Sequence, residues 1–166
     1  NAAVEVLGVQ YQQDNPYPQY NCYYHFGNYP TTCGKSITGA NAHVYLKNTG
    51  ASSGVQILQN TMINQYAVGM DISSQTGLTI SRNTLSSSTA YTSYYGIYLS
   101  SSGANLVLTK NKVAVTTGYM ALYLNACTAA SGTRGLIANN MFSVAGTSGS
   151  GYGIYNYASN YQNYYY

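Results

Sequence analysis

Residues that could carry out acid–base or metal chemistry are scarce in this chain. The carboxylates are Glu5, Asp14 and Asp71, and the histidines are His25 and His43. Hydrolysis of glycosidic bonds generally needs a pair of carboxylates, and a calcium site needs several. No Cys-x-x-Cys or other zinc-binding spacing occurs. We therefore expect no catalytic residue, no metal site and no cofactor.

Asp71 is the one carboxylate outside the N-terminal segment. It stands between Met70 and Ile72. If those two apolar side chains point inward along a strand, Asp71 points outward. We expect it to be a solvated surface residue.

The cysteines suggest where the chain works. Cys22 and Cys33 are close together in a loop-like segment and would suit a disulfide in an oxidising compartment, with unpaired thiols as the alternative. Cys127 has no evident partner. This favours an extracellular protein, secreted or on the cell surface.

The composition limits the classes of partner. The chain has 166 residues, which suits one domain, and only 5% of them are charged, against roughly 25% in typical soluble domains. The six basic residues form no dense stripe, so we expect no nucleic-acid binding. No stretch of about twenty apolar residues predicts a membrane span. Low charge makes association between copies easier.

A six-residue pattern, apolar-x-x-Asn-x-apolar, recurs four times. The copies begin at Ile57, Ile80, Leu108 and Ile137, and they place asparagine at Asn60, Asn83, Asn111 and Asn140. Asparagine tolerates left-handed backbone in turns, and stacked asparagines can hydrogen-bond as a ladder. We predict such a structural ladder, with ordinary turn asparagines as the alternative.

A second pattern, a small residue followed by apolar-x-apolar, alternates with the first. Its copies are Gly69-Met70-Asp71-Ile72, Gly96-Ile97-Tyr98-Leu99, Ala121-Leu122-Tyr123-Leu124 and the degenerate Gly153-Ile154-Tyr155-Asn156. Apolar residues at every second position indicate strands. Each repeat therefore holds two strand patterns in constant order, and stacked repeats would bury the apolar positions together.

These repeats resemble those of right-handed parallel β-helices, the pectate-lyase-like family of folds, over about residues 35–160. The resemblance implies an all-β solenoid. Lyases of this family use several carboxylates to hold calcium and a Lys or Arg base, so the scarcity of carboxylates indicates a non-catalytic member. A divergent polysaccharide lyase or hydrolase is the alternative.

We accordingly expect an N-terminal capping segment over residues 1–34 and a parallel β-helix over 35–166. The last residues, Asn160 to Tyr166, begin a further turn without a cap pattern. This predicts either head-to-tail stacking of copies into a filament, or a rigid stalk, or a piece of a longer β-helix protein.

Tyrosine occurs 21 times and marks a possible binding surface. Tyr98, Tyr123 and Tyr155 share the outward phase of three strand copies and would form an aromatic column, which could bind a polysaccharide or simply stabilise the sheet. Further tyrosines, Tyr94, Tyr95 and 164–166, are expected on the surface. The function predicted is an extracellular structural protein, with a carbohydrate-binding or adhesive module as the alternative.

Overall fold

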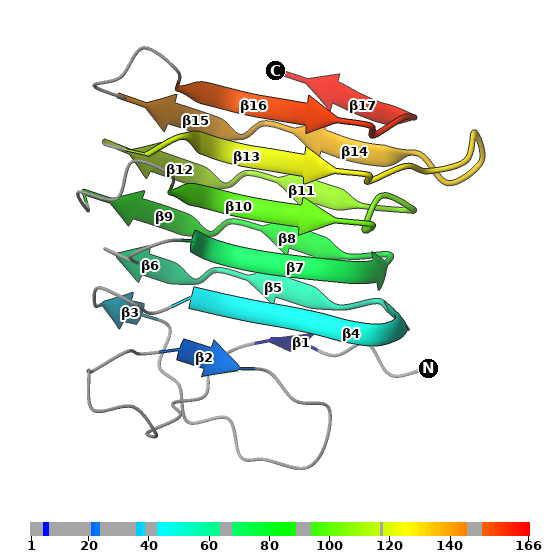
Figure 1. Cartoon of the computed structure of the whole chain (residues 1–166), viewed down its shortest axis with the longest axis horizontal. Helices are drawn as coiled ribbons and strands as arrows, with labels where there is room; N and C mark the ends of the chain where they lie inside the picture. Colours follow the sequence, from blue (N-terminus) through cyan, green and yellow to red (C-terminus); the bar gives the residue numbers. More distant parts are fainter. Residues whose placement is uncertain are drawn as a thin grey trace.

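The computed structural model describes residues 5–6, 21–23, 36–38, 43–63, 68–88, 94–116, 118–145 and 151–166, with side chains from Ser53 onward. All elements in these ranges are β-strands, and they stack into a solenoid whose N-terminal and C-terminal ends lie at opposite ends of the stack (Figure 1). This is the parallel β-helix that the repeats predicted.

Three sheets form the walls of the solenoid, here called sheets A, B and C. Sheet A contains, in spatial order, β1 (Glu5–Val6), β5 (Gln56–Leu58), β8 (Thr79–Ser81), β11 (Val107–Thr109), β14 (Gly135–Ala138) and β17 (Gln162–Tyr165). Sheet B contains β2 (Asn21–Tyr23), β4 (His43–Ser53), β7 (Val68–Thr76), β10 (Tyr95–Ser100), β13 (Met120–Asn125) and β16 (Tyr152–Tyr157). Sheet C contains β3 (Ser36–Thr38), β6 (Thr61–Ile63), β9 (Thr84–Ser87), β12 (Lys112–Val115) and β15 (Met141–Val144).

All strand pairs are parallel, and each turn runs from sheet B to sheet A to sheet C. Within the described ranges the complete turns are β4–β5–β6, β7–β8–β9, β10–β11–β12 and β13–β14–β15, followed by β16 and β17. The sequence patterns predicted two strands per turn, and the structure has three. The asparagine pattern covers two short strands and the corner between them, because each strand of sheets A and C has only three or four residues in these turns.

The N-terminal capping segment falls largely outside the described residues. From residues 1–34 the structure describes only β1, which pairs with β5, and β2, which pairs with β4.

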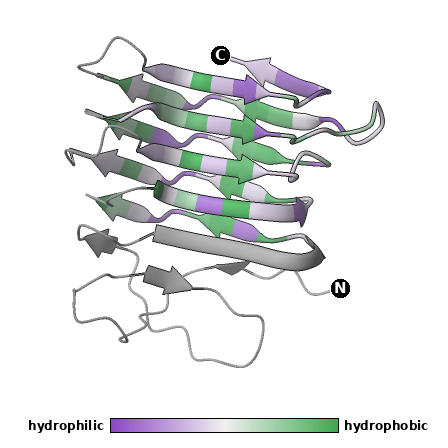
Figure 2. Ribbon diagram, viewed as in Figure 1, coloured by the Kyte–Doolittle hydropathy of each residue, from purple (hydrophilic) through white to green (hydrophobic). Residues whose placement is uncertain are grey.

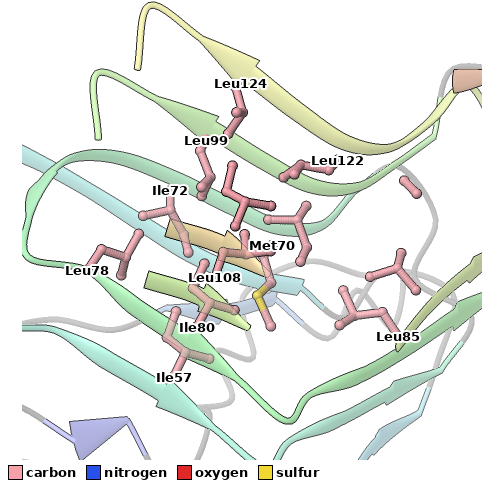
Figure 3. Close-up of a cluster of buried hydrophobic side chains, with 14 of the residues drawn as sticks. Ile57, Met70, Ile72, Leu78, Ile80, Leu85, Leu99, Leu108, Leu122 and Leu124 are labelled. Carbon is pink, nitrogen blue, oxygen red and sulfur yellow. The ribbon is translucent and has the colours of Figure 1, made fainter. Parts of the chain in front are cut away.

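The core is a set of apolar columns that run along the solenoid axis. Residues of equal phase in successive turns are Cα partners, as in the sheet A column Ile57, Ile80, Leu108 and Ile137. Figure 2 shows hydrophobic residues recurring at matching places in successive strands, and Figure 3 shows their side chains meeting between the sheets. Their exposed fractions are near zero. The turns therefore share one interior, as solenoid repeats must.

The corners are made by single residues in left-handed backbone. Between sheets A and C these are Gln59, Arg82, Lys110 and Asn139, with φ of 57°, 59°, 57° and 55°. Left-handed backbone is less favourable than right-handed backbone by roughly 1–2 kcal/mol for each L-residue. The corners persist because the stacked strands on both sides hold them in register.

The small residue that opens each sheet B pattern lies against sheet C. A Cβ added to Gly96 would come 2.6 Å from the carbonyl oxygen of Ala121 and would also clash with a methyl of Val113. Glycine is therefore required at Gly96, where the interior narrows between sheets B and C.

The last turn replaces core residues with polar ones that bond to one another. Asn156 occupies the phase of Leu124, and its amide donates to the Tyr164 hydroxyl at 3.0 Å. Gln162 pairs with Gly135 and fills the space where a Gly135 Cβ would be, and its amide donates to the Cys127 carbonyl at 2.7 Å. The last described turn thus combines these polar side chains with Ile154 and Tyr164, which pack against the core.

Truncating a core column will destabilise the whole stack. We expect Leu108→Ala to lower the free energy of unfolding by about 2–5 kcal/mol, because it leaves a cavity between three sheets. Val107→Ala, one residue away and on the outward side, is the matched control and should cost much less. Urea unfolding followed by circular dichroism measures both, and equal losses would contradict the shared interior.

Candidate functional site

The four predicted asparagines form a continuous ladder at the corner between sheets A and C. The side-chain amide of Asn60 donates to Oδ1 of Asn83, Asn83 donates to Asn111, and Asn111 donates to Asn140, each at 3.0 Å. The backbone N–H of each of the first three also donates to the same Oδ1 atom, at 2.9–3.0 Å. The structure thus brings all four residues together.

The ladder also binds the strands on either side of it. The amides of Asn83, Asn111 and Asn140 donate to the carbonyl groups of Ile57, Ile80 and Leu108 in the preceding turn, at 2.8–2.9 Å. Asn60, Asn83 and Asn111 are at most 3% exposed. A buried amide is tolerated only when its hydrogen bonds are satisfied, and here stacking satisfies them.

The reason given for asparagine at these positions was wrong in one respect. Left-handed backbone belongs to the residue before each asparagine, such as Arg82 before Asn83. That residue turns the chain, and the asparagine then points inward to hydrogen-bond. Asparagine is favoured here for its amide, which both donates and accepts.

A second polar column lies at the corner between sheets B and A, and sequence reasoning missed it. Its members are Gln75, Ser102, Cys127 and Ser159, each preceded by a residue with φ of 49–57°. The Ser102 hydroxyl accepts from the Gln75 N–H at 3.1 Å, and the Ser159 hydroxyl accepts from the Cys127 N–H at 2.7 Å. What the four residues share is that each follows a residue in left-handed backbone. Their residue types differ, so no repeated letter in the sequence revealed the column.

Cys127 is part of the packed interior. Its thiol is fully buried and donates to the Leu99 carbonyl at 3.3 Å. Burial raises the pKa of the thiol, so it stays protonated at neutral pH and is a poor nucleophile. The disulfide predicted between Cys22 and Cys33 lies outside what the structure describes, because Cys33 is outside the described residues and only the backbone of Cys22 is described.

Tyrosine rings cover the outward side of sheet B. The predicted column is brought together, because Tyr98 and Tyr123 have ring centroids 5.0 Å apart and Tyr123 and Tyr155 have theirs 5.2 Å apart. Three tyrosines that the sequence did not assign to the column, Tyr95, Tyr119 and Tyr152, extend it. We call these six residues the tyrosine face.

The rings of the tyrosine face pack on one another. Centroid separations run from 5.0 to 6.3 Å, and successive column rings meet edge to face, at 74° and 78°. This geometry is the preferred one for aromatic pairs. Desolvation, followed by charge repulsion from Tyr98 and Tyr155, raises the pKa of the Tyr123 hydroxyl.

Two other tyrosines expected on the surface lie elsewhere. Tyr94 is 1% exposed, and burial raises the pKa of its hydroxyl. Tyr164 points toward the core and accepts the hydrogen bond from Asn156. The expectation failed because each of them falls on the inward phase of its turn.

Charged groups do not gather into a catalytic cluster in the part of the chain that the structure describes. Asp71 takes the outward phase that was predicted and is the Cα partner of Tyr98. It is half-buried, however, and its Oδ1 atom is buried, so the expectation of a fully solvated carboxylate was wrong. Within the described ranges, no three His, Cys, Asp or Glu side chains are close enough to hold a metal ion. The same ranges contain no helix that is long and apolar enough to cross a membrane.

Three basic residues are closer together than their sequence positions indicated. Arg82 and Lys110 occupy the same corner position in adjacent turns, where the Arg82 N–H donates to the Thr109 carbonyl, and Lys112 begins the next strand. All three are exposed. They lie away from the tyrosine face, at the corner outside the asparagine ladder.

Comparison with protein-family models, with curated proteins and with solved structures found no match for this chain. The fold and the geometry of its surfaces therefore carry the functional argument.

Removing a central rung of the ladder will cost more than removing the last one. Asn111→Ala leaves the N–H of Asn83 buried without its acceptor, and we expect a loss on the order of 3 kcal/mol in unfolding free energy. Asn140→Ala also removes an acceptor, that of the Asn111 N–H, but it should cost clearly less because this contact is only part-buried and water can take the place of the Asn140 oxygen. Urea unfolding of the two variants tests this, and a larger loss for Asn140→Ala would refute it.

Proposed function

We propose that this chain is a structural element of an extracellular fibre or stalk, and that it lengthens end to end by adding parallel turns at its C-terminal end. In the fibre form, the added turn is the N-terminal end of a second copy. We also propose that it is a non-catalytic relative of the pectate-lyase-like β-helices. The observation that carries the proposal is the nature of the last strand in each sheet.

The strands β15, β16 and β17 are the outermost strands of sheets C, B and A at the C-terminal end of the stack. Their sequences, MFSV, YGIYNY and QNYY, contain no charged residue and no proline. Proteins that keep edge strands from pairing place lysine, other charges or proline there. These three edge strands lack such protection. They are consecutive strands at the same end of the stack, so one added turn could pair with all three.

The inward side chains of the last turn set the expected strength of the contact. Asn156 and Gln162 already bond to partners within the chain, whereas Phe142, Val144, Ile154 and Tyr164 are only partly buried. Affinity would come from burying what remains exposed of these four side chains and from edge hydrogen bonds, each worth about 1 kcal/mol net. We therefore expect assembly that depends on protein concentration. Because only 5% of the residues are charged, copies repel one another weakly, which favours this assembly.

The fibre form is tested by negative-stain electron microscopy of the purified chain at rising concentration. We expect short rods that join into longer ones. The double variant Ser143→Lys, Asn163→Lys places a lysine on the outward side of two edge strands and should prevent joining. Light scattering of the same samples gives the average length.

The matched control is the double variant Ser86→Lys, Thr79→Lys. Ser86 and Ser143 belong to one outward column of sheet C, and Thr79 and Asn163 to one outward column of sheet A. The control adds the same charge two or more turns away from the edge and should join normally. Monodisperse short rods of the unmodified chain at every concentration would rule out the fibre form.

A further inference from the structure

The tyrosine face repeats along the solenoid axis with the period of the fold. Tyr98, Tyr123 and Tyr155 are Cα partners in three successive turns, so each of these turns presents a tyrosine ring at the same position. Parallel strands in a sheet lie about 4.8 Å apart. A surface with a translational repeat is matched best by a ligand that repeats as well, and the step is close to the length of one sugar unit in an extended polysaccharide.

A polar column runs beside the rings. Ser73, Ser100 and Asn125 are Cα partners on the same outward side of sheet B, two residues beyond the aromatic column. The amide of Asn125 donates to the Tyr98 hydroxyl at 2.9 Å, which leaves its carbonyl oxygen able to accept from a ligand. Aromatic rings beside hydroxyl and amide groups suit the two sides of a sugar, its C–H faces and its hydroxyl groups.

The charge of this surface selects among ligands. The strands β10, β13 and β16 carry five of the six rings, Tyr119 directly precedes β13, and these strands contain no charged residue. The next positions down the two columns are Asp71, the Cα partner of Tyr98, and Lys47, the Cα partner of Ser73, and they have opposite charge. A polyanion would find no counter-charge in these strands, so the complementary partner is uncharged.

The packing of the rings makes the surface rigid before a ligand arrives. Each ring of the face contacts at least one other, and the chain of contacts runs unbroken from Tyr98 to Tyr119. Side chains already fixed in place lose little entropy on binding. We propose that the tyrosine face binds an uncharged polysaccharide along the solenoid axis, a role separate from end-to-end assembly.

Affinity electrophoresis in gels containing soluble polysaccharides tests this, with mixed-linkage β-glucan, xylan and galactomannan as neutral probes and alginate as the anionic one. We expect retardation by at least one neutral probe and none by alginate. The variant Tyr98→Val, Tyr123→Val, Tyr155→Val should bind about tenfold more weakly or worse. The variant Tyr165→Val, Tyr166→Val changes exposed tyrosines outside the face and should bind normally.

A second variant protects the test against loss of folding. Ser100→Lys adds a long charged side chain beside intact rings and should reduce binding, whereas Thr79→Lys on sheet A should not. Circular dichroism confirms that each variant is folded. The proposal is overturned if no neutral probe retards the chain, if alginate alone does, or if folded face variants bind as tightly as the unmodified chain. It is also overturned if the triple variant abolishes association between copies, because the face is then covered by a second copy.

Discussion

The structure depends on turns stacking in register. No single turn can bury its apolar residues, since each contributes only a few inward side chains from three short strands. Ile80 is buried because Ile57 lies below it and Leu108 above it in the same column. Loss of register by one residue would reverse every side chain between inside and outside. The corners, the ladder and both surfaces inherit their geometry from this alignment.

Two polar columns inside an apolar core help to hold that alignment. The asparagine ladder at one corner and the Gln75–Ser102–Cys127–Ser159 column at another bury backbone N–H groups whose acceptor is the side chain of the equivalent residue in the adjoining turn, as for Asn83, Gln75 and Cys127. A slipped turn would leave buried donors and acceptors unpaired, which is unfavourable by several kcal/mol in total. The columns thus specify register, and the left-handed residue before each of them brings the side chain inward.

The two surfaces that we connect with function arise from the same repetition. A solenoid presents its edges only at its ends, and the outermost described strands at the C-terminal end carry neither charge nor proline. Along its sides, outward residues of successive turns lie at equivalent positions, and this aligns the tyrosines on sheet B. The two proposed contacts therefore use different parts of the rod, one its end and the other its side.

The sequence by itself determined the all-β class, the parallel repeats, the phase of the four asparagines and the shared outward phase of Tyr98, Tyr123 and Tyr155. These follow from alternation within a strand, which is a local property. Only the tertiary structure decided that a turn has three strands, that Arg82 rather than Asn83 takes left-handed backbone, and that Tyr95, Tyr119 and Tyr152 join the aromatic surface. It also placed Gln162 in the space that Gly135 leaves. Such contacts join residues a full turn apart, and because the connections between strands vary in length, their partners are set by stacking and cannot be read from spacing along the chain.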